Sequence, residues 1–360
     1  MKFASEFRDP ALVGTITLNL RKACRGRWKL MEFCGTHTVA IFRYGLRSLL
    51  PENLILVSGP GCPVCVTPKA ELDRAIYLSG LDSSVIATYG DLVKVPGSEM
   101  SLAEKRARGA DVRVVYSSYD AVALAERLPD KRVFFVAIGF ETTAPSTAAA
   151  VLRAKALGLR NFFVLSLHKR TPPVLEALLK RGTSVEGFVC PGHVSAIIGA
   201  APFEPVASHW RRPCVVSGFE PSDVLQALLM LVRQLEDGRS QVEVEYARGV
   251  PYHGNRNALK LMDQVFTVTA SEWRGLGEVE ASGLRLREAF SPFDASAFID
   301  RDIVSLPDPP GCRCGDVLRG DISPSECALF RKNCTPENPV GPCMVSSEGS
   351  CATHYLYGDR

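Results

Sequence analysis

The feature that most constrains the fold of this 360-residue chain is an alternation of short apolar runs with longer segments of helical periodicity. Each run has the length and composition of a buried strand. The runs occupy 27–33, 54–58, 84–89, 112–116, 132–138, 161–167, 185–190 and 213–217. Strands that alternate with helices at this spacing indicate parallel sheets in doubly wound α/β layers. Because these strands are too many for one small sheet, we predict two such domains facing a cleft.

We place the boundary between the two α/β domains near residue 150, which gives units at 1–150 and 151–238. From about residue 241 the alternation stops. The last fifty residues are rich in Gly, Pro and Cys and poor in apolar runs. Such a segment could hardly fold on apolar burial alone, so a bound metal centre would contribute to its stability. We therefore assign 239–360 to a third, C-terminal domain.

Composition narrows the function classes. The formal net charge is +3 and no basic stripe is visible, so nucleic acid is not an expected partner. The first ten residues lack the apolar core of a signal peptide, and no apolar run is long enough to span a bilayer. We therefore expect a soluble, cytoplasmic protein without a membrane partner. Clustered cysteines in the cytosol indicate metal or redox chemistry rather than structural disulfides.

Two of the twelve cysteines form a Cys-x-x-Cys pair, Cys62 and Cys65, directly after the apolar run 54–58. The intervening Gly59-Pro60-Gly61 forces a sharp turn, and Thr67 and Pro68 are typical of a helix start. The thiols therefore lie on a tight loop at the carboxyl end of a strand. Such a pair can close into a disulfide, share a metal, or supply a thiolate of lowered pKa.

Other chemistry-bearing residues also follow predicted strands, at the edge where open α/β sheets bind ligands. Two facing domains would gather them in one cleft. The group comprises Cys34, Cys62, Asp91, Glu141, His168 and His193.

The individual signals in this group allow more than one interpretation. Cys34 and His37 form a Cys-x-x-His loop, which could bind a metal with further ligands from elsewhere or could be a buried cysteine beside a capping histidine. His168 and His193 are either acid–base groups or hydrogen-bonded structural residues. Glu141 either caps a helix or serves the cleft.

The C-terminal segment holds six cysteines: Cys312, Cys314, Cys327, Cys334, Cys343 and Cys351. Four thiolates suit an iron–sulfur cluster or a structural zinc. The long, irregular gaps favour a [4Fe–4S] cluster, although spacing alone does not choose four ligands out of six. We interpret Cys24, Cys190 and Cys214 as buried residues and His209, His253 and His354 as ordinary histidines. Phosphate-loop, dinucleotide-binding and serine-hydrolase motifs are absent.

Taken together, these motifs resemble the HypD family of hydrogenase maturation proteins over nearly the whole chain. The resemblance rests on Cys34–Thr38, Gly59–Cys65, Thr88–Asp91, Gly139–Thr143, Pro191–Ser195, Cys312–Gly315 and Cys334–Pro339. It implies a scaffold that works with a HypC-type chaperone to assemble the Fe(CN)2CO group of [NiFe]-hydrogenases. Cyanide would arrive through HypE together with HypF.

The resemblance also implies roles for individual residues. The family pattern Cys-x14-Cys-x6-Cys-x16-Cys assigns a [4Fe–4S] cluster to Cys312, Cys327, Cys334 and Cys351, which leaves Cys314 and Cys343 as bystanders. Cys34, with His37 beside it, would bind the iron that carries cyanide and carbonyl, and Cys62 and Cys65 would be a redox pair. Many family members carry a second histidine where this chain has Val39, which puts that histidine's role in doubt here.

The expected catalytic set is thus Cys34, His37, Cys62, Cys65, Glu141 and His193. Two other functions use the same residues. The first is an iron–sulfur-linked thiol–disulfide oxidoreductase, which would act on disulfides without HypC. The second is a zinc-binding interaction protein, which would be colourless.

Overall fold

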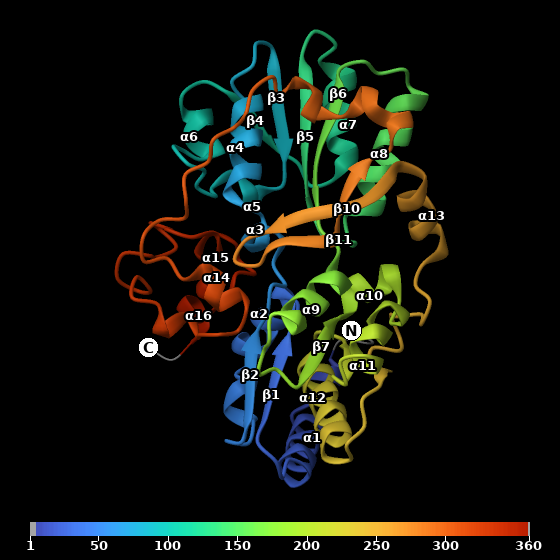
Figure 1. Ribbon diagram of the computed structural model, residues 1–360, viewed down its shortest axis with the longest axis vertical. Coiled ribbons are helices and arrows are strands. Elements are labelled where there is room, and N and C mark those ends of the chain that lie inside the picture. The colour runs from blue at the N-terminus through green and yellow to red at the C-terminus, as the bar shows by residue number, and fades with distance from the viewer. Residues whose placement is uncertain (1–4, 359–360) are drawn as a thin grey trace.

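The computed structural model describes residues 5–358; residues 1–4 and 359–360, at the ends of the first and third predicted domains, lie outside it. Figure 1 shows two parallel sheets stacked along the long axis of the molecule, with the C-terminal segment beside their junction. The predicted α/β class with two parallel sheets is confirmed. Within residues 5–358, no helix has both the length and the apolar character needed to cross a membrane.

Sheet A has five parallel strands in the order β2-β1-β7-β8-β9. Helices α1 and α12 pack against each other and bury a shared apolar cluster on one of its faces. The strands are β1 (Trp28–Glu32), β2 (Leu54–Ser58), β7 (Gly187–Pro191), β8 (Cys214–Ser217) and β9 (Val242–Val244), and the helices around them are α1 (Pro10–Ala23), α2 (Gly35–Arg43), α10 (Gly192–Ile198), α11 (Glu204–Ser208) and α12 (Pro221–Glu236).

Sheet B has four parallel strands in the order β4-β3-β5-β6, and its central strand β5 is almost wholly buried. Apolar side chains from the sheet and from α7 and α8 form one core cluster. The strands are β3 (Ser84–Thr88), β4 (Asp111–Val114), β5 (Arg132–Gly139) and β6 (Phe162–His168), and the helices are α4 (Lys69–Leu78), α5 (Gly90–Val93), α6 (Leu102–Ala107), α7 (Ser118–Arg127) and α8 (Ala144–Ala156). Helix α9 (Thr171–Lys180) connects β6 to β7 and lies next to β7 in Figure 1.

The sheets do not follow the predicted boundaries. Strands β1 and β2 were expected to share a unit with β3 to β5, yet they belong to sheet A with β7, β8 and β9, where β1 pairs with β7. The chain leaves sheet A after β2, builds sheet B, and returns at β7. Strand β6 lies beyond residue 150 but pairs with β5. Neighbouring strands usually follow one another in sequence, and that rule misplaces a chain that crosses twice between sheets.

The region after β9 also contains structure that the sequence did not indicate. An antiparallel hairpin, β10 (Phe266–Trp273) and β11 (Gly277–Leu286), packs against β6 and α9. It follows helix α13 (Arg256–Val265), which packs on α8. The irregular burial of β10 and its register shift between Thr269 and Ser271 obscure the two-residue alternation that would reveal a strand.

The C-terminal segment folds into short helices joined by turns. They are α14 (Cys314–Leu318), α15 (Pro342–Val345) and α16 (Ser350–Tyr357), and in Figure 1 they lie beside α2 and α3 (Pro63–Val66). Helix α16 packs on α2, and α15 packs on α3. The segment therefore meets the loops at the carboxyl edge of sheet A.

Candidate functional site

Cys34 follows β1 and is the N-cap residue of α2, where it is buried. The loop after β2 packs against it backbone to backbone: the Gly35 amide donates to the Gly61 carbonyl at 3.1 Å. A Cβ atom on Gly61 would lie 2.4 Å from the Cys34 nitrogen, so this approach requires glycine. The Gly-Pro-Gly turn thus places the Cys62 loop directly beside Cys34.

Glu32, the last residue of β1, is a buried carboxyl that sequence reasoning missed. It accepts hydrogen bonds from the Cys34 amide, at 3.0 Å, and from the Thr38 hydroxyl. Burial raises the pKa of Glu32 to about 7. The signal available in the sequence was an acidic residue inside an apolar run, two positions before Cys34.

The rings of His37 and His193 both stack on the ring of Phe219. Their centroids lie 4.8 Å and 3.8 Å from the Phe219 centroid respectively. The Nε2 atom of His37 bonds to the Gly218 carbonyl at 2.8 Å, and burial lowers the pKa of His37 to about 4. A neutral imidazole that donates from Nε2 keeps a lone pair on Nδ1, which has no hydrogen-bond partner among the described residues.

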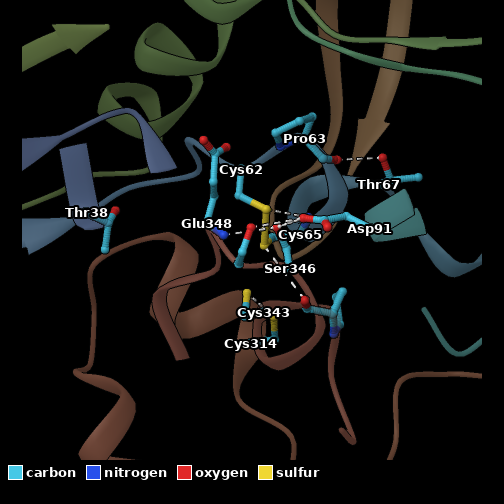
Figure 2. The surroundings of a disulfide bond; sticks show 12 residues. Thr38, Cys62, Pro63, Cys65, Thr67, Asp91, Cys314, Cys343, Ser346 and Glu348 are labelled. Atoms are coloured by element: carbon cyan, nitrogen blue, oxygen red, sulfur yellow. Dashed lines mark hydrogen bonds between the residues drawn. A yellow bond between two sulfur atoms is a disulfide. The ribbon is translucent and has the colours of Figure 1, made fainter. Parts of the chain in front are cut away.

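Cys62 and Cys65 form a disulfide with their Cα atoms 5.2 Å apart. Of the alternatives left open by the sequence, the structure therefore has the closed pair. Cys62 caps the short helix α3, and Figure 2 shows the disulfide beside Asp91, with Cys314 and Cys343 below it. The Cys65 sulfur lies 4.0 Å from the Pro342 carbonyl oxygen, at the start of α15.

The loop between α15 and α16 joins both sheets at this point. Thr36 donates to Glu348 at 2.6 Å, and the hydroxyls of Ser346 and Ser347 donate to Asp91 at 3.0 and 3.4 Å. Figure 2 shows Asp91, Ser346 and Glu348 around the disulfide. Burial and the nearby Glu348 carboxylate raise the pKa of Cys34 to about 12, so its sulfur is a thiol at neutral pH.

Two predicted site residues at the edge of sheet B, Glu141 and His168, form hydrogen bonds away from the C-terminal loop. Both oxygens of Glu141 accept hydrogen bonds from Thr171, at 2.8 Å from the amide and 2.9 Å from the hydroxyl, at the first turn of α9. His168 bonds to Thr147 at 3.0 Å. Of the six predicted groups, Cys34, Cys62 and Asp91 lie around the C-terminal loop (Figure 2), and His193 is linked to the Cys34 loop through Phe219 and His37. A catalytic role for Glu141 stays a prediction.

All six C-terminal cysteines line one small cavity, whose other walls include Val317, Leu329, Phe330 and Met344. The two expected bystanders lie in this same cavity, with the Cys314 and Cys343 sulfurs 2.6 Å apart. Cys343 belongs to α15, whose first residue touches Cys65. Sulfur groups therefore run from the cavity through the disulfide loop to Cys34. Among the described residues, no three Cys, His, Asp or Glu side chains converge closely enough to hold a single metal ion.

Comparisons with known proteins show the family of this chain. Residues 11–358 match the family model HypD, described as "Hydrogenase formation hypA family". The chain is 48% identical to the hydrogenase maturation factor HypD of Cupriavidus necator, with 99% of this chain and 97% of that protein covered. It is 46% identical to HypD of Azotobacter vinelandii and 45% identical to HypD of Rhodobacter capsulatus, covering 97% and 98% of those proteins and 99% of this chain. The chain belongs to the HypD family of hydrogenase maturation factors.

Proposed function

We propose that this protein is a scaffold on which the Fe(CN)2CO group of [NiFe]-hydrogenase is assembled together with a HypC-type chaperone. The main support for the proposal is the environment of Cys34. Its thiol lies at the junction of the loops after β1 and β2, three residues before His37, whose Nδ1 atom has no hydrogen-bond partner among the described residues. In this proposal the iron is the cargo, and Cys34 is its anchor.

The chemistry of the anchor suits that cargo. A thiolate is a soft ligand of the kind that transition-metal sites in proteins use. With a pKa of about 12, Cys34 must lose its proton when the iron binds, and a cationic metal supplies the driving force. One Cys and one His leave coordination positions for a HypC cysteine and for cyanide delivered by HypE with HypF. These partners are part of the proposal.

The cysteine cavity fits a resident [4Fe–4S] cluster. Cys312, Cys327, Cys334 and Cys351 all face one space, and its remaining walls are largely apolar. Thiolate ligands within an apolar shell are typical of iron–sulfur sites. When bound, such a cluster supplies one-electron transfer. This chain's contribution is to hold the four sulfurs beside apolar side chains.

The disulfide is proposed to be a redox pair rather than a permanent link. Reduction takes two electrons and two protons, breaks the Cys62–Cys65 bond and leaves two thiols. For such a pair a change of about 30 mV in potential shifts the equilibrium tenfold, so modest tuning by the surroundings sets its state. The contact between Cys65 and Pro342 supports communication with the cysteine cavity.

Anaerobic co-purification with a HypC-type chaperone, followed by infrared spectroscopy, tests the proposal. We expect a brown complex with cyanide and carbonyl bands. A brown protein that reduces disulfides but never retains the chaperone would favour the oxidoreductase instead. A colourless, zinc-loaded protein would contradict both.

A further inference from the structure

The loop between α15 and α16, residues 346–349, packs on the turn that carries Cys34. A Cβ atom on Gly35 would lie 2.5 Å from the Cβ atom of Glu348 and 2.8 Å from its carbonyl oxygen, so Glu348 lies directly against the backbone at Gly35. The Thr36 hydroxyl donates to the Glu348 carboxylate at 2.6 Å. Burial and, after it, the nearby Glu348 carboxylate raise the pKa of Cys34, so the loop reaches the surroundings of the thiol itself.

The same loop is fastened to sheet B. The hydroxyls of Ser346 and Ser347 donate to Asp91, which lies in α5 directly after β3, at 3.0 and 3.4 Å. Figure 2 shows Asp91 and Ser346 side by side next to the disulfide. Thr36 and Asp91 therefore hold the loop from the two sheets at once.

Polar contacts rather than apolar burial keep this loop in place. Its sequence, Ser-Ser-Glu-Gly, has no apolar side chain. The Gly349 amide closes the turn by donating to the Ser346 carbonyl at 2.9 Å, and Ser347 is exposed. A surface segment that is held by a few hydrogen bonds opens at a lower free-energy cost than a segment packed in a core.

Cys34, in contrast, is enclosed. Its exposed fraction is 8%, and the chain before it is fixed by β1, which pairs with both β2 and β7. An iron that carries cyanide and carbonyl, with a second thiolate from a partner protein, needs open space around the sulfur. Because the strands cannot yield this space without breaking sheet A, the polar loop is the neighbour that moves at low cost.

We propose that residues 346–349 form a lid over Cys34, and that Thr36 and Asp91 are its two latches. The inference rests on the proposed function, because it supplies the route by which the iron and the chaperone cysteine reach the buried thiol. In the closed state the lid keeps solutes from the sulfur. In the open state the hydrogen bonds to Thr36 and Asp91 are broken, and the sulfur faces solvent beside the loop after β2.

Alkylation of Cys34 by iodoacetamide tests the lid. In this reaction the sulfur displaces iodide from the reagent and the thiol releases its proton. The full-length protein is prepared anaerobically without a chaperone and with the disulfide closed, and mass spectrometry follows the peptide that contains Cys34. Thr36→Val removes one latch without a change in charge and should speed alkylation about fivefold. Asp91→Ala removes the other latch, at a more exposed position, and should speed it about twofold; the double variant should react about tenfold faster than wild type.

Asp120→Ala is the matched control for Asp91→Ala. Asp120 is also an exposed carboxylate that accepts two hydrogen bonds, from the Tyr116 and Ser117 amides at 3.0 and 2.9 Å, but it caps α7 and has no bond to the lid. This variant should leave the alkylation rate of Cys34 unchanged. Thermal unfolding of each variant checks that the fold is kept.

Equal alkylation rates of Cys34 in wild type, Thr36→Val and Asp91→Ala would overturn the inference, as would an equal acceleration in Asp120→Ala. The reaction needs no iron, so it gives its answer whether or not the cyanide and carbonyl bands form. A failed scaffold would remove the bands and leave the expected alkylation rates in place, whereas a failed lid would do the reverse.

Discussion

The two sheets offer a natural comparison, because both are parallel and both carry polar residues just beyond their strands. At the edge of sheet A, Cys34 has a free thiol, and the Nδ1 atom of His37 has no hydrogen-bond partner within residues 5–358. At the edge of sheet B the corresponding groups are engaged, Glu141 by Thr171 and His168 by Thr147. The general rule for ligand sites in α/β sheets covers both edges equally well.

The difference teaches that position at a strand end is a weak guide unless the hydrogen-bonding capacity of the residue is also counted. A buried carboxylate with both oxygens satisfied stabilises a helix start, whereas an orphaned nitrogen is available to a ligand. Asp91 is intermediate between the groups of the two edges. It follows a strand of sheet B, but its partners are serines of the C-terminal loop.

The largest effect is expected from a substitution at the edge of sheet A. Cys34→Ala removes the proposed iron anchor and should abolish the cyanide and carbonyl bands of the chaperone complex, while the brown colour of the C-terminal segment persists. Cys190→Ala is the matched control, because Cys190 is a fully buried cysteine within β7. It should lower stability by about 1–2 kcal/mol through lost packing and keep the bands. Bands that survive in Cys34→Ala would mean that the iron is held elsewhere.

Glu141→Ala tests the edge of sheet B. The change removes two hydrogen bonds to Thr171 and leaves a buried amide unsatisfied, so we expect a loss of about 3 kcal/mol in the free energy of unfolding. Denaturant titration measures it. The infrared bands should be unchanged in the folded fraction. If the variant keeps its stability and loses the bands, Glu141 belongs to the site after all.

Local features of the fold could be predicted from the sequence, whereas contacts between distant parts of the chain could not. Strand positions such as 54–58 and 84–88 were predictable because buried strands of a parallel sheet are continuous apolar runs. Membership of a sheet was not, since β1 and β7 meet only through long-range pairing. The contact between Thr36 and Glu348 joins residues more than three hundred positions apart. Neither of these contacts leaves a local periodicity in the chain.

Glu32 allows a pH-dependent test at the edge of sheet A, because it is a buried carboxyl there. Its pKa is raised from 4.5 to about 7, mainly by burial. Below pH 4.5 both the native and the unfolded states hold the proton. As the pH rises from 4.5 to 7, the unfolded state loses the proton first, so the stability of the native state falls.

Glu32→Gln should remove that fall. Relative to wild type, the variant should gain about 3 kcal/mol in the free energy of unfolding between pH 4.5 and pH 8, on top of a constant loss from the altered hydrogen bonds. Urea titrations at a series of pH values measure the difference. Parallel pH profiles for the two proteins would contradict a raised pKa at this position.

The smallest expected effect concerns Asp91, the sheet B residue that reaches the C-terminal loop. Asp91→Ala removes two hydrogen bonds at an exposed side chain, which should cost about 0.5 kcal/mol and leave global unfolding almost unchanged. Locally the change should matter more, because those bonds restrain the loop 346–349 that carries Glu348 to Thr36. Hydrogen exchange of the amides in 346–349 should accelerate, while exchange in β3 and β5 stays unchanged. Equal exchange rates in wild type and variant would show that Glu348 alone restrains the loop. Asp91 would then have no more influence on the C-terminal loop than Glu141 and His168.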